Sequence, residues 1–62
     1  MKVVILMGGN SKERQVSLKS GNAIFEACKH IGYNTSAIDM IEDIDYYLNE
    51  LKKNDLVFIG LH

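Results

Sequence analysis

The chain has 62 residues, 47% of them hydrophobic and 24% charged, so it can form one small domain and is too apolar to be disordered. Seven basic and eight acidic residues give a net charge of −1, which offers no electrostatic support for nucleic-acid binding. No apolar run approaches the roughly 18 residues of a membrane span, and no signal-peptide pattern is visible, so we expect a cytoplasmic chain without a membrane partner.

The first predicted element is a strand over residues 2–7, a continuous β-branched-rich run typical of a strand covered on both faces. A helix is predicted next, from Ser11 or Arg14 to Ile31, with Gly32 as its terminating residue. Apolar residues at helical spacing predict its buried face: Val16, Ala23, Ile24, Ala27, Cys28 and Ile31. We therefore expect the single cysteine to be a small buried hydrophobe, and His30 to be a helix-end residue.

Residues 33–40 are short and polar for a strand, and we place them at the edge of a sheet. Asp43 can cap a second helix, closed by residues 52–54, whose apolar stripe consists of Ile44, Tyr47, Leu48 and Leu51. Tyr46 and Tyr47, on this helix, are expected to be core or surface residues away from the crevice where Gly8 to Glu13 and His62 converge. A third strand is predicted over residues 56–61, again as a continuous apolar run.

Alternating strands and helices predict an α/β fold with right-handed crossovers and a parallel sheet. We expect the apolar first and third strands side by side in the interior and the polar second strand at the edge, which gives the order 2-1-3. The helices then cover opposite faces in a three-layer, Rossmann-like arrangement. Because the first and third strands are neighbours in this order, the functional atoms of Glu13 and His62 should lie within about 10 Å of each other.

The loop after the first strand begins with two glycines, Gly8 and Gly9. Such a loop presents backbone N–H groups at the positive end of a helix dipole, where α/β proteins bind ligands. Its spacing matches neither the dinucleotide fingerprint nor the P-loop, and the carboxylate of Glu13 suits an ammonium group better than a phosphate. From spacing alone, a capping box between Asn10 and Glu13 is the commoner arrangement.

Two stretches together carry a family resemblance. The string GGNSKERQVSLKSG, after a short apolar strand, and the ending VFIGLH resemble the N-terminal signature of the D-alanine:D-alanine ligases. The resemblance covers essentially the whole chain. It implies that residues 1–62 are the N-terminal pre-ATP-grasp domain of an ATP-dependent ligase, with the ATP-grasp domains absent. Such a ligase makes D-alanyl-D-alanine for peptidoglycan synthesis, and so for the cell wall and cell shape, through an acyl phosphate.

The resemblance also implies a site. Glu13 would be the catalytic residue that binds the ammonium group of the first D-alanine, Val16 would line the pocket for its methyl group, and His62 would help to frame the same substrate. ATP and Mg²⁺ bind elsewhere in the family, so we expect neither a cofactor nor a metal site here, and no activity from these residues alone. The implied partners are D-alanine, the rest of the ligase and a second copy in a homodimer.

Two other interpretations stay open. The chain could be an isolated, non-catalytic α/β module that binds a small molecule, or the N-terminal domain of another ATP-grasp carboxylate–amine ligase. His62, taken alone, could simply bind a carbonyl group at the end of its strand. The choice of D-alanine, D-lactate or D-serine as second substrate depends on residues outside this sequence.

Overall fold

A computed structural model describes residues 1–60 as a chain of alternating strands and helices. In order these are β1 (Lys2–Met7), α1 (Arg14–Ile31), β2 (Asn34–Asp39), α2 (Ile44–Leu51) and β3 (Leu56–Ile59). All five occupy the positions predicted from the sequence, and the α/β fold class is confirmed. Two predicted strands were too long. β2 begins one residue later and ends one residue earlier than expected, and β3 ends at Ile59.

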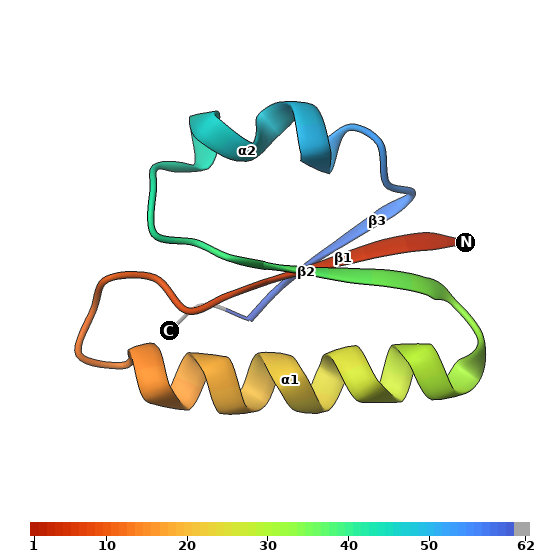
Figure 1. Cartoon of the computed structure of the whole chain (residues 1–62), viewed down its shortest axis with the longest axis horizontal. Coiled ribbons are helices and arrows are strands. Elements are labelled where there is room, and N and C mark those ends of the chain that lie inside the picture. Colours follow the sequence, from red (N-terminus) through yellow and green to blue (C-terminus); the bar gives the residue numbers. More distant parts are fainter. Residues whose placement is uncertain (61–62) are drawn as a thin grey trace.

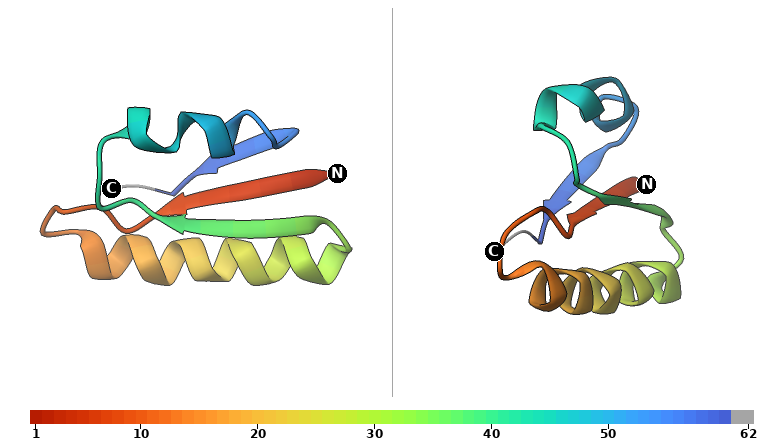
Figure 2. Two further views of the ribbon diagram at one scale, coloured as in Figure 1. Left: turned by 45° about the horizontal axis from the view of Figure 1, so that its top comes forward. Right: turned by 60° about the vertical axis from the view of Figure 1, so that its left-hand side comes forward.

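The three strands form one parallel sheet in the order β2-β1-β3, as predicted. Val4 of β1, for example, pairs with Ser36 of β2 and with Val57 of β3. All strands point the same way, so their carboxyl ends meet at one edge (Figure 2, left). The prediction that β3 lies in the interior was wrong for the described residues, since β3 forms the second edge and Phe58 is 42% exposed.

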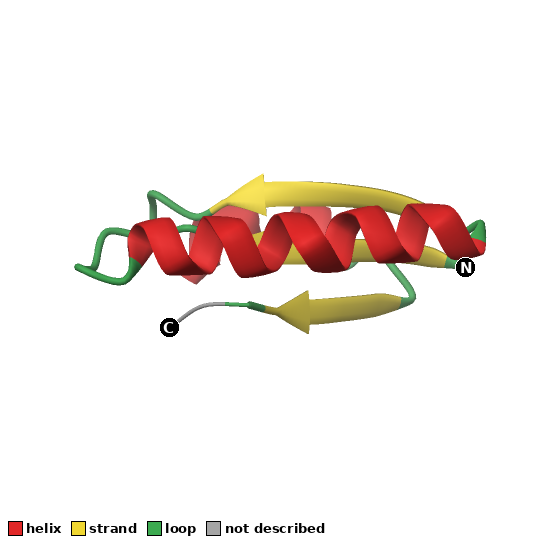
Figure 3. Cartoon of the chain, turned by 90° about the horizontal axis from the view of Figure 1, so that it is seen from below, coloured by secondary structure: helices red, strands yellow, loops and turns green. Residues whose placement is uncertain are grey.

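The two helices cover opposite faces of this sheet, which confirms the three-layer arrangement (Figure 1). Every second residue of β1 faces α1, and Val3, Ile5 and Met7 form the core there. Four residues of α1 pack against that core: Leu18, Ile24, Phe25 and Cys28. Seen from below, α1 runs over β1 while β3 lies beyond its edge (Figure 3). The core therefore centres on β1, the strand that leads into the glycine loop.

The face that α1 turns to the sheet differs from the predicted one. Only Ile24 and Cys28 of the predicted stripe pack against the core, whereas Val16, Ala23, Ala27 and Ile31 are exposed. The buried positions of α1 are instead Ser17 and Gly21. Because both residues are small, the helix approaches β1 along their side. Hydropathy alone could not identify this face, since neither residue is strongly apolar.

Helix α2 uses its apolar stripe only in part. Tyr47 and Leu51 are half-buried, whereas Ile44 and Leu48 are exposed. On the other face of β1, Val4 and Leu6 are fully buried all the same. Neither helix in residues 1–60 is both long enough and apolar enough to cross a membrane.

Candidate functional site

The loop between β1 and α1 lies at the carboxyl edge of the sheet, and its backbone depends on its two glycines. Gly8 has a φ of 83° and Gly9 a φ of 89°. Side-chain-bearing residues rarely adopt such angles, because Cβ then crowds the backbone. The two glycines let the chain turn out of β1 at once, so the loop stays close to the ends of the strands.

The buried side chain of Ser17 holds this loop through hydrogen bonds. Its hydroxyl group accepts a hydrogen bond from the backbone N–H of Gly8 at 2.9 Å and donates one to the carbonyl oxygen of Gly60 at 2.7 Å. The structure shows that these bonds join the end of β1 to the residue that follows β3.

An ion pair between Arg14 and Asp39 also holds the loop. The guanidinium of Arg14 donates to both carboxylate oxygens of Asp39, the last residue of β2, with an Nη1–Oδ1 distance of 2.7 Å. Its Nη1 also donates to the carbonyl oxygen of Gly9 at 3.0 Å. The two side chains are 34% and 44% exposed, so the pair is partly shielded from solvent. The loop is therefore fastened to all three strands.

The ion pair changes the protonation of both partners. Hydrogen bonds from Arg14, more than its charge, lower the pKa of Asp39 below its ordinary value of 3.8, and the same contact raises the pKa of Arg14. Folding therefore disfavours protonation of Asp39. Its contribution to stability is complete above the ordinary pKa and is lost as the pH falls through the lowered value.

A first prediction follows for Asp39→Asn, which keeps the size of the side chain but removes its charge. We expect the variant to have a lower Tm than the unmodified protein near neutral pH, and the difference to shrink as the pH falls below the ordinary pKa of 3.8 and through the lowered pKa of Asp39. Thermal unfolding across this range measures it. Asp45→Asn, at an exposed position of α2, is the control for the loss of one carboxylate outside the ion pair. A Tm difference for Asp39→Asn that stays constant with pH would contradict the proposed role of the pair.

Glu13 is the residue immediately before α1, at the positive end of the helix dipole. Its backbone N–H donates to the hydroxyl oxygen of Ser11 at 3.1 Å, and its side chain is exposed without a described hydrogen-bond partner. Val16 follows three residues later and is 49% exposed. Residues three apart on a helix are neighbours on its surface, so a carboxylate and an aliphatic side chain lie side by side at the loop.

The capping box between Asn10 and Glu13 is absent. The helix start has no side-chain cap, and the amide of Asn10 donates instead to the carbonyl oxygen of Ile41 at 2.9 Å. This contact joins the glycine loop to the loop after β2. The carboxylate of Glu13 is therefore not used as a cap, which removes the commoner interpretation of its position.

The hydroxyl group of Tyr47 lies beside the loop that follows β2. It accepts hydrogen bonds from the backbone N–H groups of Ile41 and Glu42, both at 3.2 Å. The ring stands edge-on to Tyr46, with centroids 5.1 Å apart. Helix α2 thus fixes the same loop that Asn10 contacts.

The expected approach of His62 to Glu13 lies outside the described residues. The strand order that this approach requires is present, and the neighbouring Gly60 donates its N–H to the carbonyl oxygen of Leu6 at 2.8 Å. The end of β3 is therefore held beside the end of β1, and the shared site of Glu13 and His62 stays a prediction.

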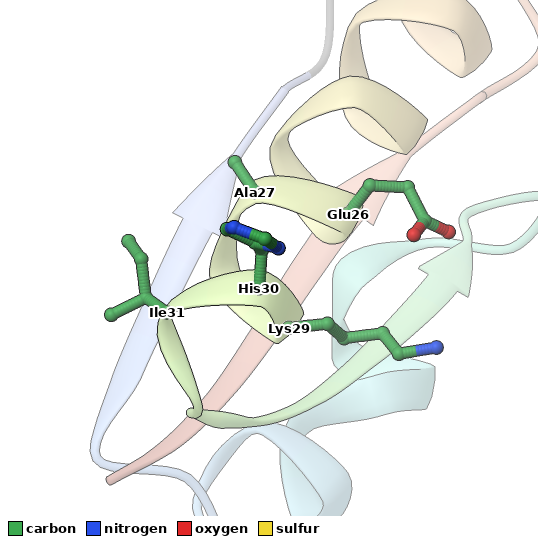
Figure 4. A pocket seen from close by; sticks show the side chains of 5 residues that line it. All are labelled: Glu26, Ala27, Lys29, His30 and Ile31. Atoms are coloured by element: carbon green, nitrogen blue, oxygen red, sulfur yellow. The ribbon is translucent and has the colours of Figure 1, made fainter.

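An open hollow lies elsewhere, over the last turns of α1. It is lined by Glu26, Ala27, Lys29, His30 and Ile31 (Figure 4). Ala27 and Ile31 point to one side of the helix, and Glu26 and Lys29 point to the other (Figure 4). Arg14 and Ala27 are separated by about 20 Å along the helix axis, at 1.5 Å per residue. The hollow therefore has no part in the glycine-loop site.

Sequence reasoning did not identify Asp39 as part of this site. A signal was present, because Arg14 sits in the first turn of a helix, where positive charge is unfavourable unless an anion is close. Asp39 ends the neighbouring strand in the predicted order and is a natural candidate for that anion. The contacts of Arg14 with Gly9 and of Ser17 with Gly60 depend on backbone geometry that residue types alone do not indicate.

Comparison with known proteins points to one family. The family model described as "D-ala D-ala ligase N-terminus" matches residues 2–62. Proteins named D-alanine–D-alanine ligase are 44% identical in Aquifex aeolicus and 42% in Thermotoga petrophila, over the whole chain and 21% and 20% of their own lengths. The ligase of Pseudoalteromonas translucida is 51% identical over 98% of the chain and 20% of its own length.

The chain thus spans about a fifth of the length of these curated relatives. Its parallel sheet and its two glycines at the end of β1 fit the Rossmann-like N-terminal domain that the resemblance implied. The family model covers nearly every residue, including the entire glycine loop. The chain therefore belongs to the D-alanine–D-alanine ligase family and matches its N-terminal domain.

Proposed function

We propose that this chain is the substrate-binding N-terminal segment of a cytoplasmic, ATP-dependent ligase that joins two D-alanine molecules for peptidoglycan synthesis. In this proposal residues 8–16 hold the first D-alanine. The observation that carries it is the carboxylate of Glu13, which is exposed and does not cap the helix. It lies at the end of a loop that is held to the sheet by hydrogen bonds. The family match supports the choice of substrate.

Glu13 has the charge and position needed to bind an ammonium group. An ion-paired hydrogen bond between a carboxylate and an ammonium group is among the stronger kinds. Val16 lies on the same side of the helix start and offers aliphatic surface for the methyl group of D-alanine. His62 would approach from the end of β3 and complete the frame around the substrate.

The loop contributes to the reaction by positioning. ATP would supply the phosphoryl group that turns the carboxylate of the first D-alanine into an acyl phosphate, and the amine of the second D-alanine would then attack the acyl carbon and release phosphate. Holding the first D-alanine by its ammonium group leaves its carboxylate free and oriented for that chemistry. A well-oriented bound reactant removes much of the entropic barrier of a bimolecular step.

The residues at this loop do not fit ATP. The N–H of Gly8 already donates to Ser17, and the carboxylate of Glu13 would repel a phosphate at the helix start. ATP and Mg²⁺ would therefore be held by other parts of the ligase. It follows that this segment alone should not catalyse ligation.

The test of this proposal is Glu13→Gln in the complete ligase. We expect the apparent affinity for the first D-alanine to fall by roughly 10- to 150-fold, because a charge-assisted hydrogen bond contributes about 1.5–3 kcal/mol. The KM for ATP and the Tm should change little. Steady-state phosphate release at varied D-alanine and ATP measures both constants.

Glu26→Gln is the matched control, since it makes the same change at an exposed position of α1 away from the loop. Its kinetics should equal those of the unmodified enzyme. If Glu13→Gln behaved like this control, Glu13 would have no role in binding the substrate and the proposed function of the loop would be wrong.

A further inference from the structure

Ser17 is the only polar side chain in residues 1–60 that is completely buried. It lies in the second turn of α1, next to the apolar core of β1. Alanine has a higher helix propensity and would bury no polar atom at this position. A serine here is favourable only if its hydroxyl group is satisfied, and both of its hydrogen bonds are formed.

The two bonds of Ser17 use the donor and the acceptor capacity of one hydroxyl group at once. The acceptor side fixes the N–H of Gly8, the first residue of the glycine loop, and the donor side fixes the carbonyl oxygen of Gly60. Gly60 is bound on its other side too, because its N–H donates to Leu6. A single side chain therefore links Gly8 to Gly60, next to the backbone hydrogen bond that already joins the ends of β1 and β3.

Ser17 is also linked directly to the residue proposed to bind the substrate. Its backbone N–H donates to the carbonyl oxygen of Glu13 at 2.9 Å, which is the first hydrogen bond of the helix. Ser17 thus links the backbone of Glu13 to the residue that follows β3. Glu13 itself has no described side-chain contact that could fix it instead.

We propose that Ser17 is a positioning residue for the first amino acid substrate. Its hydroxyl group holds the helix turn that carries Glu13 in register with the end of β3, so that groups on both elements reach one small molecule. This inference rests on the proposed function, because it assumes that Glu13 binds the ammonium group. Ser17 touches no substrate itself and acts through the backbone of Gly8, Gly60 and Glu13.

The test is a double-mutant cycle in the complete ligase with Ser17→Ala and Glu13→Gln. We expect Ser17→Ala alone to lower kcat/KM for the first D-alanine by about 10- to 100-fold, since a displacement of about 1 Å can have such an effect. In the Glu13→Gln background the same substitution should lower it by less than about threefold, because the contact that it positions is already lost. The KM for ATP should stay unchanged in both.

Ser20→Ala is the matched control, one turn further along α1, where no described hydrogen bond involves the side chain. It should leave the kinetics unchanged. If Ser17→Ala does not give a folded enzyme, Ser17→Cys serves in the cycle, because the thiol group fills the position of the hydroxyl group but is a weak donor and acceptor.

Equal losses from the serine substitution in both backgrounds would show a general structural role and overturn the positioning role alone. A Ser17→Ala enzyme with the kinetics of the Ser20→Ala control would do the same. Unchanged D-alanine kinetics in Glu13→Gln would overturn the proposed function, and the positioning role with it.

Discussion

Gly8→Ala should destabilise the protein by about 2–5 kcal/mol and abolish binding at the glycine loop. A φ of 83° is unfavourable by about 1–2 kcal/mol for a residue with a side chain. The new methyl carbon would also lie 2.1 Å from Oδ1 of Asp39 and 2.9 Å from Nη1 of Arg14. Such overpacking costs about 1–3 kcal/mol, and it can be relieved only if the ion pair moves away from the loop.

Gly32→Ala is a control that separates the cost of backbone strain from the cost of overpacking. Gly32 also has a positive φ, of 104°, but an added methyl group there meets nothing within 4 Å. This control should therefore lose only the about 1–2 kcal/mol of backbone strain. Equal losses of unfolding free energy for the two variants would show that the contact with Asp39 is unimportant.

If this steric explanation is right, the loss of stability caused by Gly8→Ala depends on the side chain of Asp39. In an Asp39→Ala background the methyl group gains room, because the clashing carboxylate is removed and Arg14 loses the partner that holds it near the loop. We expect the loss of unfolding free energy caused by Gly8→Ala to fall towards that of the Gly32→Ala control. An additive double variant would contradict this coupling.

Gly21→Ala should destabilise the protein by about 1–3 kcal/mol, although alanine is the better helix former by about 1 kcal/mol. The added methyl carbon would lie 2.5 Å from Cβ of Met7. Because Cβ is fixed to the backbone of β1, relief requires that α1 move away from the sheet. Ser17, one turn earlier on the same face, would move with the helix and lose its hydrogen bonds to Gly8 and Gly60.

Thermal unfolding and D-alanine kinetics of the Gly21→Ala ligase measure both effects. Asn22→Ala is the control, at the next position and fully on the exposed side of the helix. It should be neutral or slightly stabilising, as helix propensity predicts. A Gly21→Ala enzyme more stable than the unmodified one would show that α1 does not need this close approach to β1.

The strand order was predictable from the sequence because hydropathy separates the strands. The apolar run of residues 2–7 had to be buried on both faces, and the polar residues 34–36 excluded β2 from the centre. The face of α1 was not predictable in the same way. Its contact with the sheet depends on the small residues Ser17 and Gly21, whereas the more apolar Val16 and Ile31 are exposed.

The candidate site, too, was only partly predictable from the sequence. The prediction of a site at the glycine pair and Glu13 followed from sequence, because both depend on local chemistry at a strand-to-helix turn. The fastening of the loop did not, since Asp39, Ile41 and Gly60 reach it only through the tertiary fold. Those contacts are set by backbone positions and not by residue type.

The hydrogen bonds of Ser17 also set an order of events during synthesis. Its bond to Gly8 spans nine positions in the chain, and its bond to Gly60 spans 43. The first can form as soon as α1 folds on β1, whereas the second must wait until β3 has emerged from the ribosome and closed a long loop. A nascent chain that has emerged only as far as Asn54 therefore contains every residue of the glycine loop but lacks the bond from Ser17 to Gly60.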